Sequence, residues 1–181
     1  MKILAIIGSL RKDSYNLQLA LKTKEMIGDR AEFEVLDYSD VPMFNQDLEL
    51  PELPQLKRVR DKVKEADAIW FFSPEYNSFF SGPLKNIIDW ISRPIPVESK
   101  DLLVNKPAAV SGITVGGFGT APSQTSLVGL LTIVNMKVMN NPRVRIPNAS
   151  QLVNSERKLD LTSVEKYIEA QIKAFLGFIG E

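Results

Sequence analysis

The sequence predicts an α/β fold, a doubly wound sandwich in which helices cover both faces of a mostly parallel sheet. Five apolar runs typical of strands alternate with five stretches of helical periodicity along the 181 residues, and each crossover between parallel strands needs a helix of this length. The run from Ala68 to Phe72 is apolar on both faces, as a central parallel strand is. With 44% hydrophobic and 24% charged residues, the chain suits a single domain, residues 1–181.

Each element is expected from local pattern. A glycine-aspartate pair at Gly28 ends the first helix, and three prolines mark the loop before the second. The expected strands are residues 3–7, 33–36, 68–72 and 107–113, with a weak fifth strand at Val138 or Val144. The expected helices are residues 15–27, about 55–65, 82–91, 122–135 and 164–179.

The balance of charge and the missing residue types restrict the function. Twenty-two basic residues balance 22 acidic ones, so no overall positive field exists to hold nucleic acid or an anionic membrane. The chain has no cysteine and no histidine, which excludes disulfides, thiol nucleophiles, Cys/His zinc sites and serine-histidine triads. An enzyme so composed uses carboxylates, lysines or tyrosines, or relies on a cofactor for the difficult step.

The N-terminus and the overall hydropathy predict a cytoplasmic protein. The apolar run after Met1 is only five residues long and ends at Gly8 without a small-residue cleavage site, so it is predicted to be a buried strand. No stretch reaches the roughly 18 apolar residues of a membrane span.

The segment GSLRKDSYN, Gly8 to Asn16, is expected to bind an anion. It follows the first strand and opens the first helix, and it lacks both the Walker A and the GxGxxG patterns. Its Ser9, Ser14 and Asn16 can donate to phosphate oxygens, Arg11 adds a forked cation, and the free amides of the helix start point the same way. The alternative is that Gly8 only turns the chain and that Ser14 or Asp13 caps the helix.

Two further loops follow strands that end at the same edge of the predicted sheet, where ligands of such folds bind. After the third strand come Pro74, Glu75, Tyr76 and Asn77, which could contact the edge and face of a flat heteroaromatic ring, and then Phe79 and Phe80, both expected to be exposed. After the fourth strand, the segment from Ser111 to Ser123 has glycines at Gly116, Gly117 and Gly119, which let a backbone approach a ligand closely. The alternatives are a core or subunit contact, a polar turn and a flexible surface loop.

Three motifs in this order, GSLRKDSYN, PEYNSFFSGPLKNIIDW and GGFG, resemble the NAD(P)H-dependent FMN reductase family of flavodoxin-like proteins, which includes quinone, azo and chromate reductases. The resemblance extends from Met1 to about Pro147. It departs from the family after the last glycine, where the family often has an arginine and this chain has none until Arg143. The proline also follows Gly82 here, whereas the family usually places it before the glycine.

The resemblance implies a flavodoxin-like three-layer sandwich with a five-stranded parallel sheet of order 2-1-3-4-5. It further implies one FMN per subunit, NADPH or NADH as co-substrate, and a homodimer or homotetramer. The implied phosphate contacts are Ser9, Arg11, Ser14 and Asn16; the implied flavin contacts are Pro74, Glu75, Tyr76 and Asn77; and Ser111, Gly116 and Gly117 match the third contact loop.

The implied function is an enzyme that reduces quinones or similar small acceptors, such as flavin, azo dye or chromate, by ping-pong hydride transfer. Hydride transfer at the flavin needs no protein nucleophile, so no catalytic residue and no metal are expected. Two other functions remain open: a flavodoxin-type electron carrier, against which the zero net charge and Arg11 argue, and a flavin-free interaction protein of the same fold.

Overall fold

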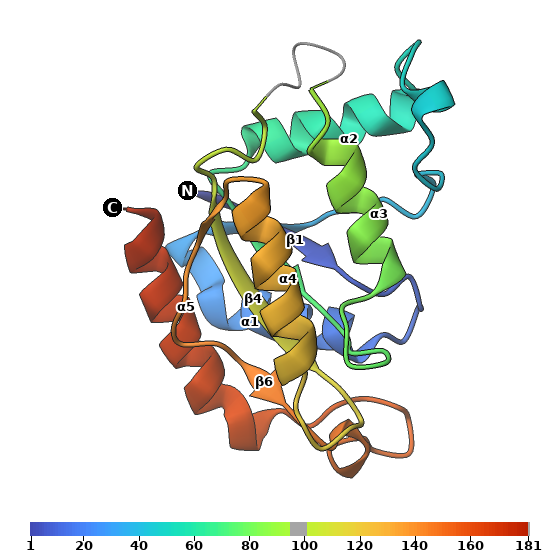
Figure 1. Ribbon diagram of the computed structural model, residues 1–181. Helices are drawn as coiled ribbons and strands as arrows, with labels where there is room; N and C mark the ends of the chain where they lie inside the picture. Colours follow the sequence, from blue (N-terminus) through green and yellow to red (C-terminus); the bar gives the residue numbers. More distant parts are fainter. Residues whose placement is uncertain (95–100, 181) are drawn as a thin grey trace.

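A parallel sheet of strand order β2-β1-β3-β4-β5 forms the centre of the molecule (Figure 1), in a computed structural model that describes residues 1–94 and 101–180. This confirms the predicted fold class and strand order. The strands are β1 (Lys2–Ile7), β2 (Glu32–Val35), β3 (Ala68–Phe72), β4 (Pro107–Ile113), β5 (Lys137–Val138) and β6 (Arg145–Ile146).

The weak fifth strand of the prediction is two short strands. β5 pairs with the start of β4, at Pro107 and Ala108, and β6 pairs in parallel with its end, at Gly112 and Ile113. Each of these strands has two residues, too few to pair along all seven residues of β4. The chain leaves the sheet between β5 and β6 and so pairs with β4 at both of its ends.

In the described residues five α-helices flank the sheet, and the bounds of α1 (Tyr15–Ile27) and α3 (Gly82–Ile91) agree with the prediction. The other three are α2 (Pro54–Glu65), α4 (Ala121–Ile133) and α5 (Glu165–Ile179). The α4 helix ends two residues before the expected Asn135, which adopts a left-handed φ of 61°. The turn before α5, Thr162–Val164, is a 3₁₀ helix.

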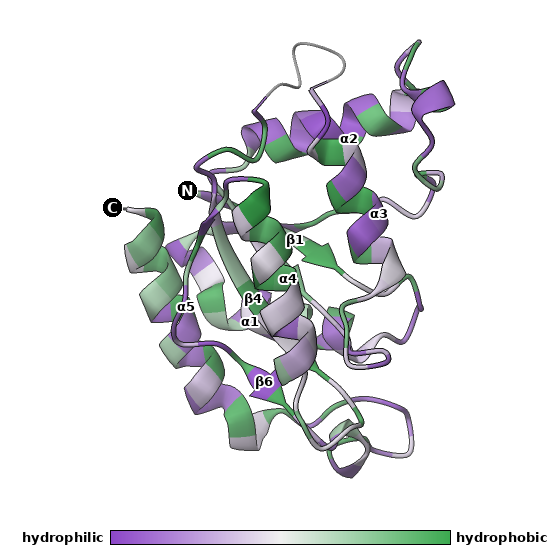
Figure 2. Ribbon diagram, viewed as in Figure 1, coloured by the Kyte–Doolittle hydropathy of each residue, from purple (hydrophilic) through white to green (hydrophobic). Residues whose placement is uncertain are grey.

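The helices lie in two layers, with α1 and α5 on one face of the sheet and α2, α3 and α4 on the other. Successive strand residues point to opposite faces: Ile3, Ala5 and Ile7 join the core under α1 and α5, while Leu4 and Ile6 join the core on the other face. Because both faces of β1 are buried, the strand is hydrophobic from Ile3 to Ile7, as Figure 2 shows. The same figure shows a largely hydrophilic outer surface on α2. Within the described residues, no helix has the length and apolar character needed to cross a bilayer.

Candidate functional site

The loop between β1 and α1 is held by local bonds that leave its donors available to a ligand. Ser14 caps α1, because its Oγ accepts the Leu17 N–H at 3.3 Å. Its own hydroxyl hydrogen can still donate, as can that of Ser9, whose Oγ accepts the Arg11 N–H at 3.4 Å. The N–H groups of the first helical turn have no carbonyl partner inside the helix. The capping alternative and the anion-binding hypothesis are therefore compatible.

Gly8 is required by close packing at the base of this loop. A Cβ atom on Gly8 would lie 2.8 Å from Leu84 Cδ1, Pro74 Cδ and Ser81 Oγ. The Gly8 N–H donates to the Phe72 carbonyl at 2.8 Å. The first loop therefore sits directly against the loop that follows β3.

A cavity of about 280 Å³ opens at the carboxyl edge of the sheet between these loops. Seven of the eleven predicted site residues line it. Its lining consists of Ser9, Arg11, Ser14, Tyr15, Asn16, Pro74, Glu75, Tyr76, Ile113, Thr114 and Val115. The prediction missed Tyr15, Ile113, Thr114 and Val115; Tyr15 belongs to the first motif, and the other three mark where β4 reaches the edge.

Asn16 lines the cavity, but its side-chain amide is used inside the protein. Its Nδ2 donates to the Ile113 carbonyl at 3.0 Å, and its Oδ1 accepts the Ile113 N–H at 3.1 Å. The side chain thus pairs with the end of β4 as another strand would. Asn16 positions the start of α1 against β4, and its main-chain N–H is the donor that remains for an anion.

Asn77 is not among the described residues that line the cavity. Its backbone conformation explains why an asparagine stands at this position. Tyr76 and Phe79 exchange N–H···O bonds of 3.1 and 3.0 Å, which closes a two-residue turn. Asn77 and Ser78 have φ values of 53° and 59°, the left-handed region that such turns require and that asparagine tolerates. The turn leaves Tyr76 57% and Phe79 51% exposed, but Phe80 is 7% exposed and stacks on Phe79, so its expected exposure was wrong.

Ser111, Gly116 and Gly117 are not among the residues that line this cavity. Ser111 faces the core: its Oγ accepts the Trp70 Nε1–H at 2.8 Å and donates to Gln171 Oε1 at 2.6 Å. It points there because alternate residues of a strand face opposite layers. Residues 113–115, which lie in the chain between the predicted Ser111 and Gly116, line the cavity in place of these three residues.

The charge of the cavity comes from Arg11 and Glu75. The Arg11 guanidinium lies 4.9 Å from the Tyr15 ring centroid, and the exposed side chain donates to the Asp13 carbonyl. The Glu75 carboxylate accepts the Ser123 N–H at 3.2 Å. Beneath the loop, the Tyr38 hydroxyl donates to the Ile7 carbonyl, and burial raises the pKa of this phenol above its ordinary value. The cation thus comes from the loop before α1, and the carboxylate from the loop that follows β3.

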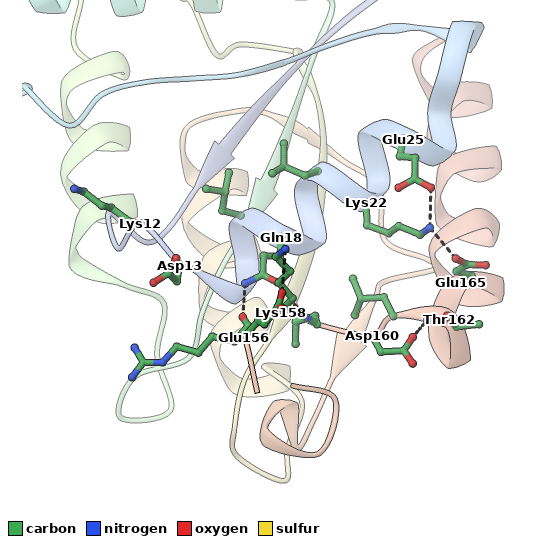
Figure 3. Close-up of a pocket in the computed structure, with 15 residues that line it drawn as sticks. Lys12, Asp13, Gln18, Lys22, Glu25, Glu156, Lys158, Asp160, Thr162 and Glu165 are labelled. Carbon is green, nitrogen blue, oxygen red and sulfur yellow. Dashed lines mark hydrogen bonds and ion pairs between the residues drawn. The ribbon is translucent and has the colours of Figure 1, made fainter. Parts of the chain in front are cut away.

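A larger cavity, of about 600 Å³, lies between α1 and the segment 156–165 (Figure 3). None of the predicted site residues lines it, and its charges largely compensate one another: Lys22 pairs with Glu25 at 2.9 Å and with Glu165 at 2.8 Å. Gln18 joins its two walls, donating to the Arg157 carbonyl and accepting the Leu159 N–H. The smaller cavity is the candidate site because the three loops of the sheet edge meet there. In the described part of the chain, no cluster of acidic residues could hold a metal ion.

Comparison with known proteins identifies relatives along the whole chain. A family model described as NADPH-dependent FMN reductase matches residues 1–151. An NAD(P)H-dependent FMN reductase of Pseudomonas aeruginosa is 34% identical over 175 residues, 96% of this chain and 92% of the relative. A 2-hydroxy-1,4-benzoquinone reductase of Burkholderia sp. is 29% identical over 180 residues, 99% of this chain and 96% of the relative. The solved structure of FerB, a flavoenzyme NAD(P)H:(acceptor) oxidoreductase of Paracoccus denitrificans, superposes with a TM-score of 0.87 at 30% identity, covering 99% of this chain and 97% of that chain.

Proposed function

The chain belongs to the NADPH-dependent FMN reductase family, and we propose that it is an NAD(P)H-dependent FMN oxidoreductase that reduces quinones, with residues 1–181 as one FMN-binding domain. The observation that carries the proposal is the family match over residues 1–151, within which Ser9, Arg11 and Ser14 line one cavity with donors suited to an anion. Relatives named quinone reductase, from Pseudomonas putida and Burkholderia, support a quinone as the acceptor.

The residues of the cavity fit the phosphate end of FMN. Ser9 and Ser14 each keep a free hydroxyl hydrogen, Arg11 is a cation at the rim, and the N–H groups of Tyr15 and Asn16 open α1. This set matches a monoester phosphate, because serine hydroxyls, amides and a guanidinium are all donors. We propose that these five residues hold it.

The loop after β3 fits the flavin ring. Pro74, Glu75 and Tyr76 line the cavity, and the half-exposed Tyr76 ring offers an aromatic face. Bound FMN would supply the redox chemistry, hydride transfer between a nicotinamide and the acceptor, which the side chains of this cavity do not provide themselves. The chain binds and orients the reactants and keeps one face of the site open to both. Asn77 enters the proposal as the residue that forms the turn, and Ser111 as a residue that holds β4 through its bonds to Trp70 and Gln171. Gly116 and Gly117 stay proposed contacts between the loop after β4 and the flavin.

An electron-carrier function is not favoured. The relatives over most of the chain are named as reductases or oxidoreductases. The chain also has zero net charge, whereas a carrier that docks on redox partners through opposite charge benefits from a strong field of one sign. A likeness to an archaeal flavodoxin at 17% identity reflects the fold.

We propose that the enzyme works as a homodimer or homotetramer in the cytoplasm, where reduced nicotinamide nucleotides are used. The cavity of one chain, about 280 Å³, lies just below the roughly 300–1,000 Å³ of complete ligand pockets. Tyr76 and Val115 line the cavity, and Phe79 and Phe118 follow them closely in the sequence. All four apolar side chains are more than half exposed. A second copy would cover this patch and complete the site.

Steady-state kinetics of the purified, FMN-loaded protein test the proposed function. We expect the yellow protein to bleach on addition of NADPH or NADH and to regain its colour when a benzoquinone is added. Because donor and acceptor would share one opening, double-reciprocal plots at several quinone concentrations should be parallel. A protein that stays colourless with FMN would contradict the proposal, and a yellow protein that does not bleach would support the electron carrier. Intersecting plots would require a second binding site.

A further inference from the structure

Ser123, the third residue of α4, bonds to the loop that follows β3. It is completely buried, as is Ser73. Its Oγ donates to the Pro74 carbonyl at 3.0 Å and lies 2.9 Å from Ser73 Oγ, which itself lies 2.8 Å from the same carbonyl. Its main-chain N–H donates to Glu75 Oε2 at 3.2 Å. Residues 48 to 50 positions apart are thereby joined next to the cavity.

The start of α4 takes its acceptor from this distant loop. The N-cap position is Thr120, which has a left-handed φ of 63° and makes no side-chain capping bond. The Thr120 hydroxyl instead accepts from Gln124 Nε2 at 3.0 Å. The Glu75 carboxylate therefore occupies the place of an N-cap, where a negative charge is stabilised by the amides and dipole of the helix.

The turn itself cannot set its own position. The reciprocal bonds between Tyr76 and Phe79 fix the shape of the turn, but they do not connect it to the rest of the molecule. The bonds to Ser123 join Pro74 and Glu75, near the start of the loop, to a helix that packs on the sheet. The start of the loop also packs closely against β4, since a Cβ atom on Gly112 would lie 2.4 Å from the Ser73 carbonyl oxygen.

We propose that Ser123 and Glu75 form a latch that positions the Pro74–Tyr76 segment at the ring end of the cavity. Both are positioning residues, and the latch rests on the proposed function because its purpose is to hold a flavin-binding loop. Glu75 thus has a role that its place in the sequence motif does not reveal: its carboxylate is directed to α4, which leaves its main chain and Tyr76 to face the ligand.

Four variants separate the latch from general effects. Ser123→Ala removes both hydroxyl contacts, and Glu75→Ala removes the carboxylate. Glu75→Gln keeps an oxygen that accepts the Ser123 N–H and should restore the latch. Ser126→Ala is the matched control, because the Ser126 hydroxyl donates within its own helix, to the Pro122 carbonyl at 3.2 Å.

The first measurement is FMN affinity by fluorescence titration, with the visible circular dichroism of the bound flavin as a signature of ring position. We expect Ser123→Ala to weaken FMN binding about 2- to 10-fold and Glu75→Ala about tenfold or more, both with an altered flavin spectrum. Glu75→Gln and Ser126→Ala should stay within about twofold to threefold of the parent. Equal affinities and spectra for Ser123→Ala and Ser126→Ala would overturn the latch.

The second measurement is hydrogen exchange of the peptide covering residues 74–81 in the FMN-free protein. Exchange should accelerate in Ser123→Ala and Glu75→Ala but not in Glu75→Gln or Ser126→Ala, and unchanged exchange in all four would overturn the latch. This arm needs no cofactor, so a parent protein that fails to bind FMN would contradict the proposed function while the exchange data still decide whether the latch holds the loop.

Discussion

Arg11 is the only cation among the described residues that line the candidate cavity. Its side chain is exposed and is held by the Asp13 carbonyl and the Tyr15 ring rather than by a carboxylate. No acidic partner therefore has to be displaced when an anion binds. Its charge is available to a phosphate, and the forked guanidinium can donate two parallel bonds to it.

We expect Arg11→Ala to weaken FMN binding by about 1.5–3 kcal/mol, the range for a hydrogen bond to a charged group. Fluorescence titration of the FMN-free protein measures this. Lys12→Ala is the control, because Lys12 lines other cavities and not this one. Equal affinity of the Arg11 variant and the parent would remove Arg11 from the site.

At the scale of elements, α3 holds the long segment that leaves β2. Asn86 accepts the Phe44 N–H at 2.7 Å and donates to the Pro42 carbonyl at 2.9 Å, and Trp90 Nε1 donates to the same carbonyl at 2.8 Å. The Phe44 and Trp90 rings meet edge to face at 4.8 Å. These side chains come from the motif that indicated a flavin protein, yet here they organise the chain beside the sheet.

Asn86→Ala should lower the free energy of unfolding by about 1–3 kcal/mol, since the Phe44 N–H and the Pro42 carbonyl each lose a partner in a half-buried place. Urea denaturation measures the change. The matched control is Lys85→Ala, which removes only the exposed pair with Asp89 at 2.7 Å and should cost less than about 0.5 kcal/mol. Similar losses in both variants would show that the Asn86 bonds contribute little.

At the scale of the whole molecule, the exposed apolar side chains at and near the cavity, Tyr76, Phe79, Val115 and Phe118, predict self-association. We expect sedimentation at micromolar concentration to give at least twice the chain mass of 20.3 kDa. Phe79→Ser should shift the equilibrium towards the monomer, because Phe79 is 51% exposed beside the cavity. Leu21→Ser, at a residue 48% exposed on α1, should not. A single species of 20 kDa in the parent protein would contradict this expectation.

The pH dependence of stability follows from groups spread over the molecule. The Arg30 guanidinium, which joins the end of α1 to α5, lowers the pKa of Glu169, and the Ser39 N–H lowers the pKa of Asp37. A lowered native pKa contributes stability that is complete above the unfolded-state pKa, near 4, and is lost as the pH falls through the native value. Burial raises the pKa of Tyr38, so its contribution is lost as the pH rises above about 10.

Urea midpoints should therefore be highest between about pH 5 and 9 and fall on both sides. Glu169→Gln should reduce the loss between pH 7 and 3, and Tyr38→Phe should reduce the loss between pH 9 and 11. Slopes identical to those of the parent in both variants would assign the pH dependence to other groups.

Local signals account for the parts of the fold that the sequence predicted well. The bounds of α1 and α3 agree with the structure because Ser14 caps the one, Gly82-Pro83 opens the other, and the apolar spacing lies within each helix. The bounds of β4 agree with a segment that is buried from Ala108 to Ile113 and has Ser111 as its one hydrogen-bonding side chain. The division of the fifth strand into β5 and β6 could not be predicted, because each strand has only two residues, too few to show the alternation of a strand.

The alternation of strands and helices, the family, and the anion-binding composition of the loop after β1 could all be predicted from the sequence, since each depends on residues close together in the chain. Which side chains reach the cavity depends instead on contacts between residues far apart in the chain. The Asn16 side-chain amide donates to the Ile113 carbonyl, 97 residues away. The Ser111 hydroxyl donates to Gln171 on α5, and the Glu75 carboxylate accepts from the start of α4. These partners meet only when the helices pack on the sheet, and a buried polar group takes whichever partner packing brings within reach, because leaving it unpaired costs about 1–3 kcal/mol.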